Sequence, residues 1–123
     1  MDVKKSLGLV AHDEKKQLLA DWCKKHSAKL SQLDLYSTGT TGQKIIAHTG
    51  LELTRLASGP LGGDAQLGAM IAEKRLDGLI FFIDGLAAMP HDVDVKALIR
   101  LATIYDVPFA CNQSTANAVL ELF

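Results

Sequence analysis

The sequence predicts an α/β fold: a single-domain, doubly wound, three-layer α/β/α arrangement around a mostly parallel five-stranded sheet. Short apolar runs of strand length alternate with segments of helical periodicity along the whole chain. Strands that are separated by helices form parallel sheets covered on both faces. With 123 residues and no internal repeat or linker, we expect residues 1–123 to form one domain.

The first strand and helix are predicted within residues 6–26. Residues 6–11 (SLGLVA) form an apolar run typical of a buried strand. Residues 13–26 carry apolar side chains at helical spacing, with Leu19 and Trp22 on one face and the lysines elsewhere. We expect Asp13 to be the N-cap of this helix, because its carboxylate can accept N–H groups that a first turn leaves unpaired.

The same alternation continues to the end of the chain. Further strands are expected at residues 33–37, 51–56, 78–83 and 108–111. Further helices are expected at residues 38–47, 64–74, 92–105 and 114–122. Gly50 is placed to end the first of these helices, because glycine readily adopts the left-handed conformation that closes a helix.

Charge and cysteine content narrow the class of protein. Thirteen basic and fourteen acidic residues are spread along the chain, so we expect a small-molecule ligand and no nucleic acid. Cys23 and Cys111 lie far apart and lack the spacing of a zinc site, so we expect free thiols in a reducing cytosol and no metal. The longest apolar run, residues 78–83, is far shorter than the roughly 20 residues that span a membrane. We therefore expect a cytoplasmic protein that does not contact membranes.

The fold predicts where a ligand binds. In open parallel sheets, ligands lie outside the carboxyl ends of the strands. The segments that follow the predicted strands hold most of the chemically versatile side chains: AHDEKK, STGTTG, SGPLGGD, DGLAAMPHDVD and NQST. We therefore expect a site at this one edge of the sheet.

The turn STGTTG, residues 37–42, indicates anion binding. A helix N-terminus offers unpaired N–H groups, the threonines add hydroxyl donors, and the glycines let the backbone approach a ligand. The turn lacks the lysine of a P-loop and the spacing of a dinucleotide-binding turn. Lys16 could add a cation beside the anion. An ordinary strand-to-helix turn and a surface lysine remain the alternatives.

Two other loops supply groups for acid and base chemistry. His12 and Asp13 follow the first strand, and His91, Asp92 and Asp94 precede or begin a helix. A histidine and a carboxylate that return to one sheet edge from different loops suggest proton transfer. The alternative is that these are solvated loop residues, with Asp92 only complementing the helix dipole.

The stretch SGPLGGDAQ, residues 58–66, places Asp64 after a turn rich in glycine. The glycines could remove side chains so that a substrate lies against the backbone with a carboxylate directed at it. Asp64 could equally be an N-cap of the helix that it begins. Local sequence leaves both interpretations open.

Six motifs together resemble one family. They are LVAHDEKK, STGTTG, SGPLGGDAQLGA, LIFFIDGL, PHDVDVKALIRLA and NQSTA. They resemble the methylglyoxal synthase family in order and spacing over nearly the whole chain. The resemblance implies a cytosolic homohexameric lyase that converts dihydroxyacetone phosphate to methylglyoxal and inorganic phosphate without metal or organic cofactor. Ile83 and Gly85 depart from it, because family members commonly have Trp and Pro there.

The resemblance also implies roles for individual residues. The catalytic residues would be Asp64 as the base, Asp94 as a second carboxylate and His91 near the substrate oxygens. The substrate-binding residues would be His12, Asp13, Lys16, Thr38, Gly39, Thr40, Thr41, Ser58, Gly59 and His91. Inorganic phosphate would be the product and a candidate inhibitor.

A non-catalytic module is the main alternative. The same fold resembles the regulatory domain of large carbamoyl phosphate synthetases, which binds effectors. Such a module would need the phosphate-binding turn but not Asp64, His91 and Asp94 together. Because the chain has all three residues, the sequence favours the enzyme.

Overall fold

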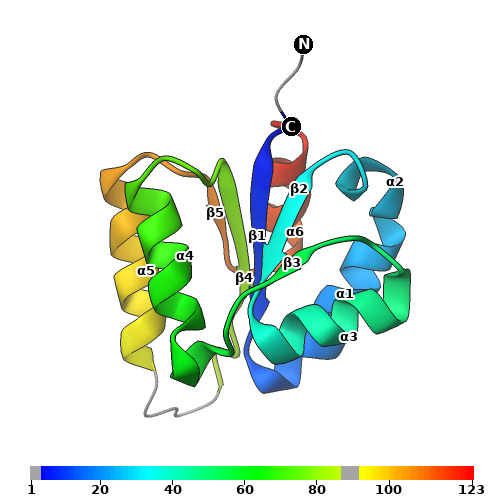
Figure 1. Cartoon of the computed structure of the whole chain (residues 1–123), viewed down its shortest axis with the longest axis horizontal. Coiled ribbons are helices and arrows are strands. Elements are labelled where there is room, and N and C mark those ends of the chain that lie inside the picture. The colour runs from blue at the N-terminus through cyan, green and yellow to red at the C-terminus, as the bar shows by residue number, and fades with distance from the viewer. Residues whose placement is uncertain (1–3, 87–91) are drawn as a thin grey trace.

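The computed structural model describes residues 4–86 and 92–123, with the backbone alone for residues 92–94. A five-stranded parallel sheet has the order β3-β2-β1-β4-β5 (Figure 1). The strands are β1 (Ser6–Ala11), β2 (Asp34–Ser37), β3 (Thr54–Arg55), β4 (Gly78–Phe82) and β5 (Phe109–Ala110). The helices are α1 (Lys16–Lys25), α2 (Ser27–Leu30), α3 (Gly39–Thr49), α4 (Gly63–Ala72), α5 (Asp92–Ile104) and α6 (Gln113–Leu120). Two 3-10 turns are η1 (Asp13–Lys15) and η2 (Gly59–Leu61). The doubly wound fold is confirmed.

The central strand β1 divides the core into two layers. Successive side chains of a strand point to opposite faces, so Leu7 and Leu9 enter one apolar cluster and Val10 enters the other. The first cluster includes buried side chains of α1, α3 and α6, and the second includes those of α4 and α5. Figure 1 shows α4 and α5 together on one side of the sheet, with α1 and α3 on the other. The three-layer arrangement follows from this alternation.

The buried face of α1 is anchored by Trp22. Its ring is 2% exposed, and its Nε1–H donates to Asn117 Oδ1 of α6 at 2.8 Å. Cys23 is also buried, and burial raises the pKa of its thiol to about 12. Both cysteines are free, as predicted. The predicted apolar face of this helix is confirmed.

The N-cap prediction for Asp13 is wrong. Residues 13–15 form a 3-10 turn, whose N-cap is His12, and α1 begins only at Lys16. His12 is extended, its carbonyl accepts the N–H of Lys15 at 2.8 Å, and no side chain caps the turn. The Asp13 carboxylate instead bonds to the Lys16 ammonium group. A competing ion pair therefore replaces the cap.

Other element ends differ by a few residues. The predicted strand at 51–56 is reduced to Thr54–Arg55, because β3 is an edge strand that pairs with β2 only at Tyr36 and Ser37. The short helix Ser27–Leu30 and the turn Gly59–Leu61 were not predicted. Gly50 does end α3, with φ of 73°.

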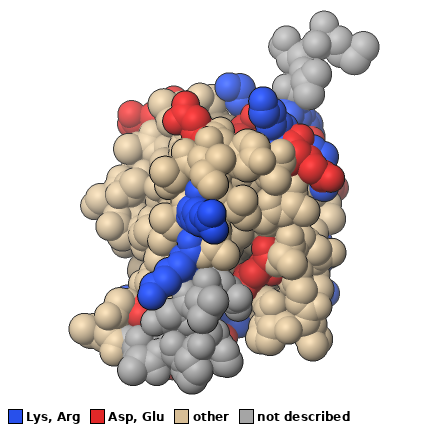
Figure 2. All heavy atoms as spheres, turned by 90° about the vertical axis from the view of Figure 1, so that its left-hand side faces the viewer, with Lys and Arg blue, Asp and Glu red and all other residues tan. Residues whose placement is uncertain are grey.

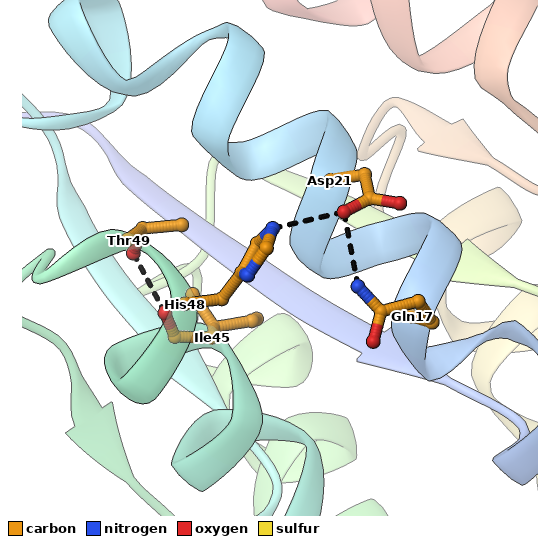
Figure 3. Close-up of polar contacts among 5 residues, drawn as sticks. All are labelled: Gln17, Asp21, Ile45, His48 and Thr49. Atoms are coloured by element: carbon orange, nitrogen blue, oxygen red, sulfur yellow. Dashed lines mark hydrogen bonds and ion pairs between the residues drawn. The ribbon is translucent and has the colours of Figure 1, made fainter.

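Helices α1 and α3 lie side by side and are joined by polar side chains. His48 Nε2 lies 2.9 Å from Asp21 Oδ1, and Gln17 donates to the same oxygen at 3.0 Å (Figure 3). On α3 itself, the Thr49 hydroxyl donates to the carbonyl of Ile45 at 2.7 Å. The His48–Asp21 contact joins the two helices away from their N-termini, which meet where Lys16 bonds to Thr40.

The described helices are short. The longest, α5, has 13 residues, whereas a membrane-spanning helix needs about 20. Within residues 4–86 and 92–123, no helix is both long enough and apolar enough to cross a bilayer.

Candidate active site

A cavity of about 420 Å³ opens at the carboxyl ends of the strands, at the lower edge of the sheet in Figure 1. Its walls come from the ends of β1 and β4 and from the loops after β1, β2 and β3. Its lining residues are Val10, Ala11, His12, Asp13, Lys16, Thr38, Thr40, Thr41, Ser58, Gly59, Pro60, Asp64, Phe81 and Val95. The structure therefore places the cavity where the fold rule predicts it.

The start of α3 forms one wall. Thr38, the extended N-cap residue, is 5% exposed and Thr41 is 1% exposed. The buried hydroxyl of Thr41 has no hydrogen-bond partner among the described residues. A helix N-terminus carries a partial positive charge and unpaired N–H groups. A buried hydroxyl donor beside it suits an anionic ligand, since buried polar groups otherwise find protein partners.

Lys16 adds a full positive charge to this wall. Its Nζ donates to Thr40 Oγ1 at 2.6 Å and lies 2.7 Å from Asp13 Oδ1. The side chain of Lys16 is 18% exposed, whereas that of Asp13 is 81% exposed. The hydrogen bond and charge of Lys16 lower the pKa of Asp13. The ammonium group is thereby held over the first turn of α3.

Asp64 lies across the cavity from these donors. The N-cap of α4 is Gly62, with φ of 116°, and Asp64 is the second residue of the helix. The alternative in which Asp64 is the N-cap is therefore wrong. A Cβ added to Gly59 would lie 3.5 Å from Asp64 Oδ2. The carboxylate thus lies close to the backbone of Gly59.

The orientation of His12 is set by the end of β4. The backbone N–H of Asp84 donates to His12 Nδ1 at 2.9 Å. Because Nδ1 accepts this bond, Nε2 is the ring nitrogen left to donate. The ring also packs edge-on against Phe81, with centroids 5.2 Å apart. The hydrogen bond from Asp84 and the contact with Phe81 therefore fix the orientation of the His12 ring.

The structure brings most of the predicted site residues together. Most residues predicted to bind or act on a substrate line one cavity. They are His12, Asp13, Lys16, Thr38, Thr40, Thr41, Ser58, Gly59 and Asp64. Gly39 is the first residue of α3, between two lining threonines. His91 lies outside the described residues, and Asp94 lies in the first turn of α5, beside the lining residue Val95.

Potential metal ligands do not cluster in the part of the chain that the structure describes. There, no three side chains of His, Cys, Asp or Glu lie close enough to hold one ion. Lys16 and the threonines that line the cavity supply donor groups, which suit an anion better than a cation.

Comparisons with known proteins identify the family. Residues 18–111 match the family model of the MGS-like domain. A methylglyoxal synthase of Proteus mirabilis is 56% identical over 95% of this chain and 77% of its own length. A methylglyoxal synthase of Agrobacterium fabrum is 53% identical over 98% of this chain and 96% of its own length. The chain belongs to the methylglyoxal synthase family.

A solved structure of the methylglyoxal synthase family has the same fold. The crystal structure of methylglyoxal synthase from Elizabethkingia anophelis superimposes with a TM-score of 0.90 at 50% identity, over 95% of this chain and 77% of that one. The relatives are named as enzymes, which confirms the prediction of an enzyme over a regulatory module. The family assignment made from the six motifs is likewise confirmed.

Three features of this methylglyoxal synthase family site were not predicted from the sequence. They are the Asp84 N–H that orients His12, the Arg55 Nε that donates to the Gly39 carbonyl at 3.2 Å, and the Gln66 Oε1 that accepts the Ala57 N–H at 2.8 Å. Asp84 follows β4, so the sequence does place it at the edge of the sheet where the cavity lies, but not beside His12. Arg55 and Gln66 bond to backbone atoms of other elements, and no local pattern reveals such partners.

Proposed function

We propose that the chain converts dihydroxyacetone phosphate to methylglyoxal and inorganic phosphate in this cavity. The observation that carries the proposal is the position of Asp64: its carboxylate shares a cavity with a helix N-terminus and a lysine. A substrate with an anionic phosphate and an acidic C–H bond needs both parts. The family membership supports the same reaction.

The phosphate would bind at the start of α3. The Thr41 hydroxyl lacks a partner among the described residues, and Lys16 already lies 2.6 Å from Thr40 Oγ1. Together with the first-turn N–H groups these donors would neutralise the charge of the ester and then that of the departing phosphate. Ser58 and Gly59 would close the cradle from the side of Asp64.

Asp64 would act as the general base. It takes a proton from the hydroxymethyl carbon beside the ketone, and the C–H electron pair becomes the double bond of an enediolate. The hydroxyl of the enediolate then gives its proton to the departing phosphate and becomes the aldehyde carbonyl, while the double bond shifts to the other carbon and the C–O bond to phosphate breaks. The resulting enol becomes methylglyoxal when a proton returns to carbon. Asp64, once protonated, is placed to return it.

The oxyanion of the enediolate needs a neutral donor. His12 Nε2–H is suited to that role, because Nδ1 already accepts a backbone N–H and leaves Nε2 to donate. We propose that His91 and Asp94 complete the site, as the family resemblance implies, with His91 near the substrate oxygens and Asp94 as a second carboxylate. A hydrogen-bond donor already positioned for the charge that develops in the transition state increases the rate by about 10² to 10³-fold.

We propose further that the chain forms a homo-oligomer, a homohexamer by the family resemblance, and is cytoplasmic. Figure 2 shows the face over α4 and α5 as mostly uncharged. Ile99 and Tyr105 are each 38% exposed there, and Ile104 is 60% exposed. Such apolar exposure is typical of protein–protein interfaces. The free thiols of both cysteines suit a reducing compartment. Light scattering after size exclusion tests the assembly.

A single assay tests the reaction. The purified chain is incubated with dihydroxyacetone phosphate in the presence of a metal chelator, and methylglyoxal and inorganic phosphate are followed together. Equal release of both products is expected. Binding of inorganic phosphate without turnover of the substrate would contradict the lyase proposal and leave only a phosphate-binding module.

A further inference from the structure

The loop that carries Ser58 and Gly59 is held between two helices. On one side, the Gly39 N–H of α3 donates to the Ala57 carbonyl at 3.3 Å. On the other side, the Gly63 N–H of α4 donates to the Ser58 carbonyl at 3.0 Å. The loop therefore connects the phosphate-binding end of α3 with the helix that carries Asp64.

One side chain completes this connection. Gln66 Oε1, on the exposed surface of α4, accepts the N–H of Ala57 at 2.8 Å. Gln66 follows Asp64 by two residues in the same helix, so the bond joins the helix of the carboxylate to the residue just before Ser58. The Ala57 peptide is thus bonded to α3 through its carbonyl and to α4 through its N–H.

We propose that Gln66 is a positioning residue, which fixes the Ser58–Gly59 loop relative to the Asp64 carboxylate. This inference rests on the proposed function and assigns a role to a side chain that does not line the cavity. The carboxylate lies close to Gly59, so movement of the loop changes the distance between the base and the bound ester. Proton transfer depends steeply on that distance.

The test compares two substitutions at Gln66. Gln66→Met keeps the length of the side chain and removes the acceptor, whereas Gln66→Glu keeps an acceptor oxygen. Ala65→Glu, at the exposed neighbouring position, is the control for the added negative charge. All variants are compared by kcat and KM for dihydroxyacetone phosphate, by affinity for inorganic phosphate and by melting temperature.

We expect Gln66→Met to lower kcat about tenfold and to change KM by less than about threefold, since a loss of alignment acts mainly in the transition state. Gln66→Glu should restore kcat to the level of Ala65→Glu. An unchanged kcat in Gln66→Met, an effect confined to KM, or a Gln66→Glu variant as impaired as Gln66→Met would overturn the proposal.

Phosphate affinity separates this inference from the proposed function. We expect Gln66→Met to bind inorganic phosphate about threefold more weakly at an unchanged melting temperature, because the loop supplies part of the cradle. If the unmodified chain does not turn over the substrate, the proposed function fails and this measurement still decides the role of Gln66. Equal phosphate affinity in both proteins would then overturn the positioning role.

Discussion

Two hollows lie at opposite ends of β2, and the larger one is not the proposed active site. The larger, of about 530 Å³, lies at the amino ends of the strands and is lined by Lys4, Asp34 and Glu52, among others. It also meets Gly50, the C-cap of α3. The smaller, of about 420 Å³, meets the N-cap of the same helix. One helix therefore contributes opposite ends to the two hollows.

From this difference we expect the end of the helix to decide where an anion binds, and not the volume of the hollow. Each hollow is lined by one lysine and two carboxylates, so their side-chain charges are alike. The larger hollow, however, meets the C-terminus of α3, which carries a partial negative charge. The smaller hollow combines the positive end of α3 with Lys16 and buried threonine hydroxyls. We therefore expect an anion to bind in the smaller hollow and not in the larger one. The following predictions test that contrast, beginning with the largest effect.

Replacing the carboxylate of the smaller hollow should abolish catalysis. Asp64→Asn removes the proposed base with little change in shape, and we expect kcat to fall about 10³-fold or more, within the range of general-base catalysis and its coupled steps. Steady-state kinetics and thermal melting are measured together. Asp34→Asn, in the larger hollow, is the matched control and should retain activity. A loss of stability as large as the loss of activity would show that Asp64 has a structural role.

Removing a lysine should weaken the binding of inorganic phosphate only when that lysine lines the smaller hollow. Lys16→Met should weaken the binding of inorganic phosphate about 10- to 100-fold, the value of a charge-assisted hydrogen bond. Lys4→Met, the corresponding change in the larger hollow, should leave the affinity unchanged. Titration calorimetry of both variants is the measurement. Similar losses in the two would mean that overall charge, and not the site, attracts phosphate.

Thr41→Val should have opposite effects on binding and on stability. The variant loses a hydroxyl donor, so phosphate should bind about fivefold more weakly. It also replaces a buried hydroxyl that lacks a partner among the described residues with a methyl group, which should raise the free energy of unfolding by about 1 kcal/mol. Urea unfolding without phosphate and calorimetry with it give the two numbers. A destabilised variant would indicate that the hydroxyl has a protein partner.

Adding a positively charged side chain to the larger hollow should not create a phosphate-binding site there. Glu52→Lys removes one carboxylate and adds an ammonium group, but the negative end of α3 remains beside it. We expect no second phosphate site in a calorimetric titration. Appearance of a second site of comparable affinity would show that a lysine alone is sufficient and would remove helix direction from the explanation.

Much of the fold was predictable because it depends on local patterns. The alternation of Leu7, Leu9 and Val10 on β1 and the apolar face around Trp22 determine which surfaces pack. A glycine also predicted the end of one helix correctly, because Gly50 is the C-cap of α3. The prediction that Asp13 caps the helix was wrong because its carboxylate forms an ion pair with the Lys16 ammonium group. Capping rules do not take such a competing partner into account.

The site was predictable only in part. The rule for carboxyl ends of strands placed His12, Thr38 and Asp64 at one edge without further information. The rule could not say whether Asp64 caps its helix or lines the cavity. That depends on which residue is the N-cap of α4, and the structure shows that it is Gly62. Partners such as Gln66 and Ala57, or Asp84 and His12, are set by tertiary packing and carry no sequence signature.

The close approach of Gly63 to the Ala57 carbonyl restricts which residues can precede Asp64. A Cβ at position 63 would lie 2.1 Å from that oxygen and 2.9 Å from the Thr38 methyl group. The first turn of α4 and the residue before Ser58 are therefore in direct backbone contact, and any side chain at position 63 would force them apart. Glycine at position 63 therefore sets how closely the helix that carries Asp64 approaches the loop that carries Ser58 and Gly59.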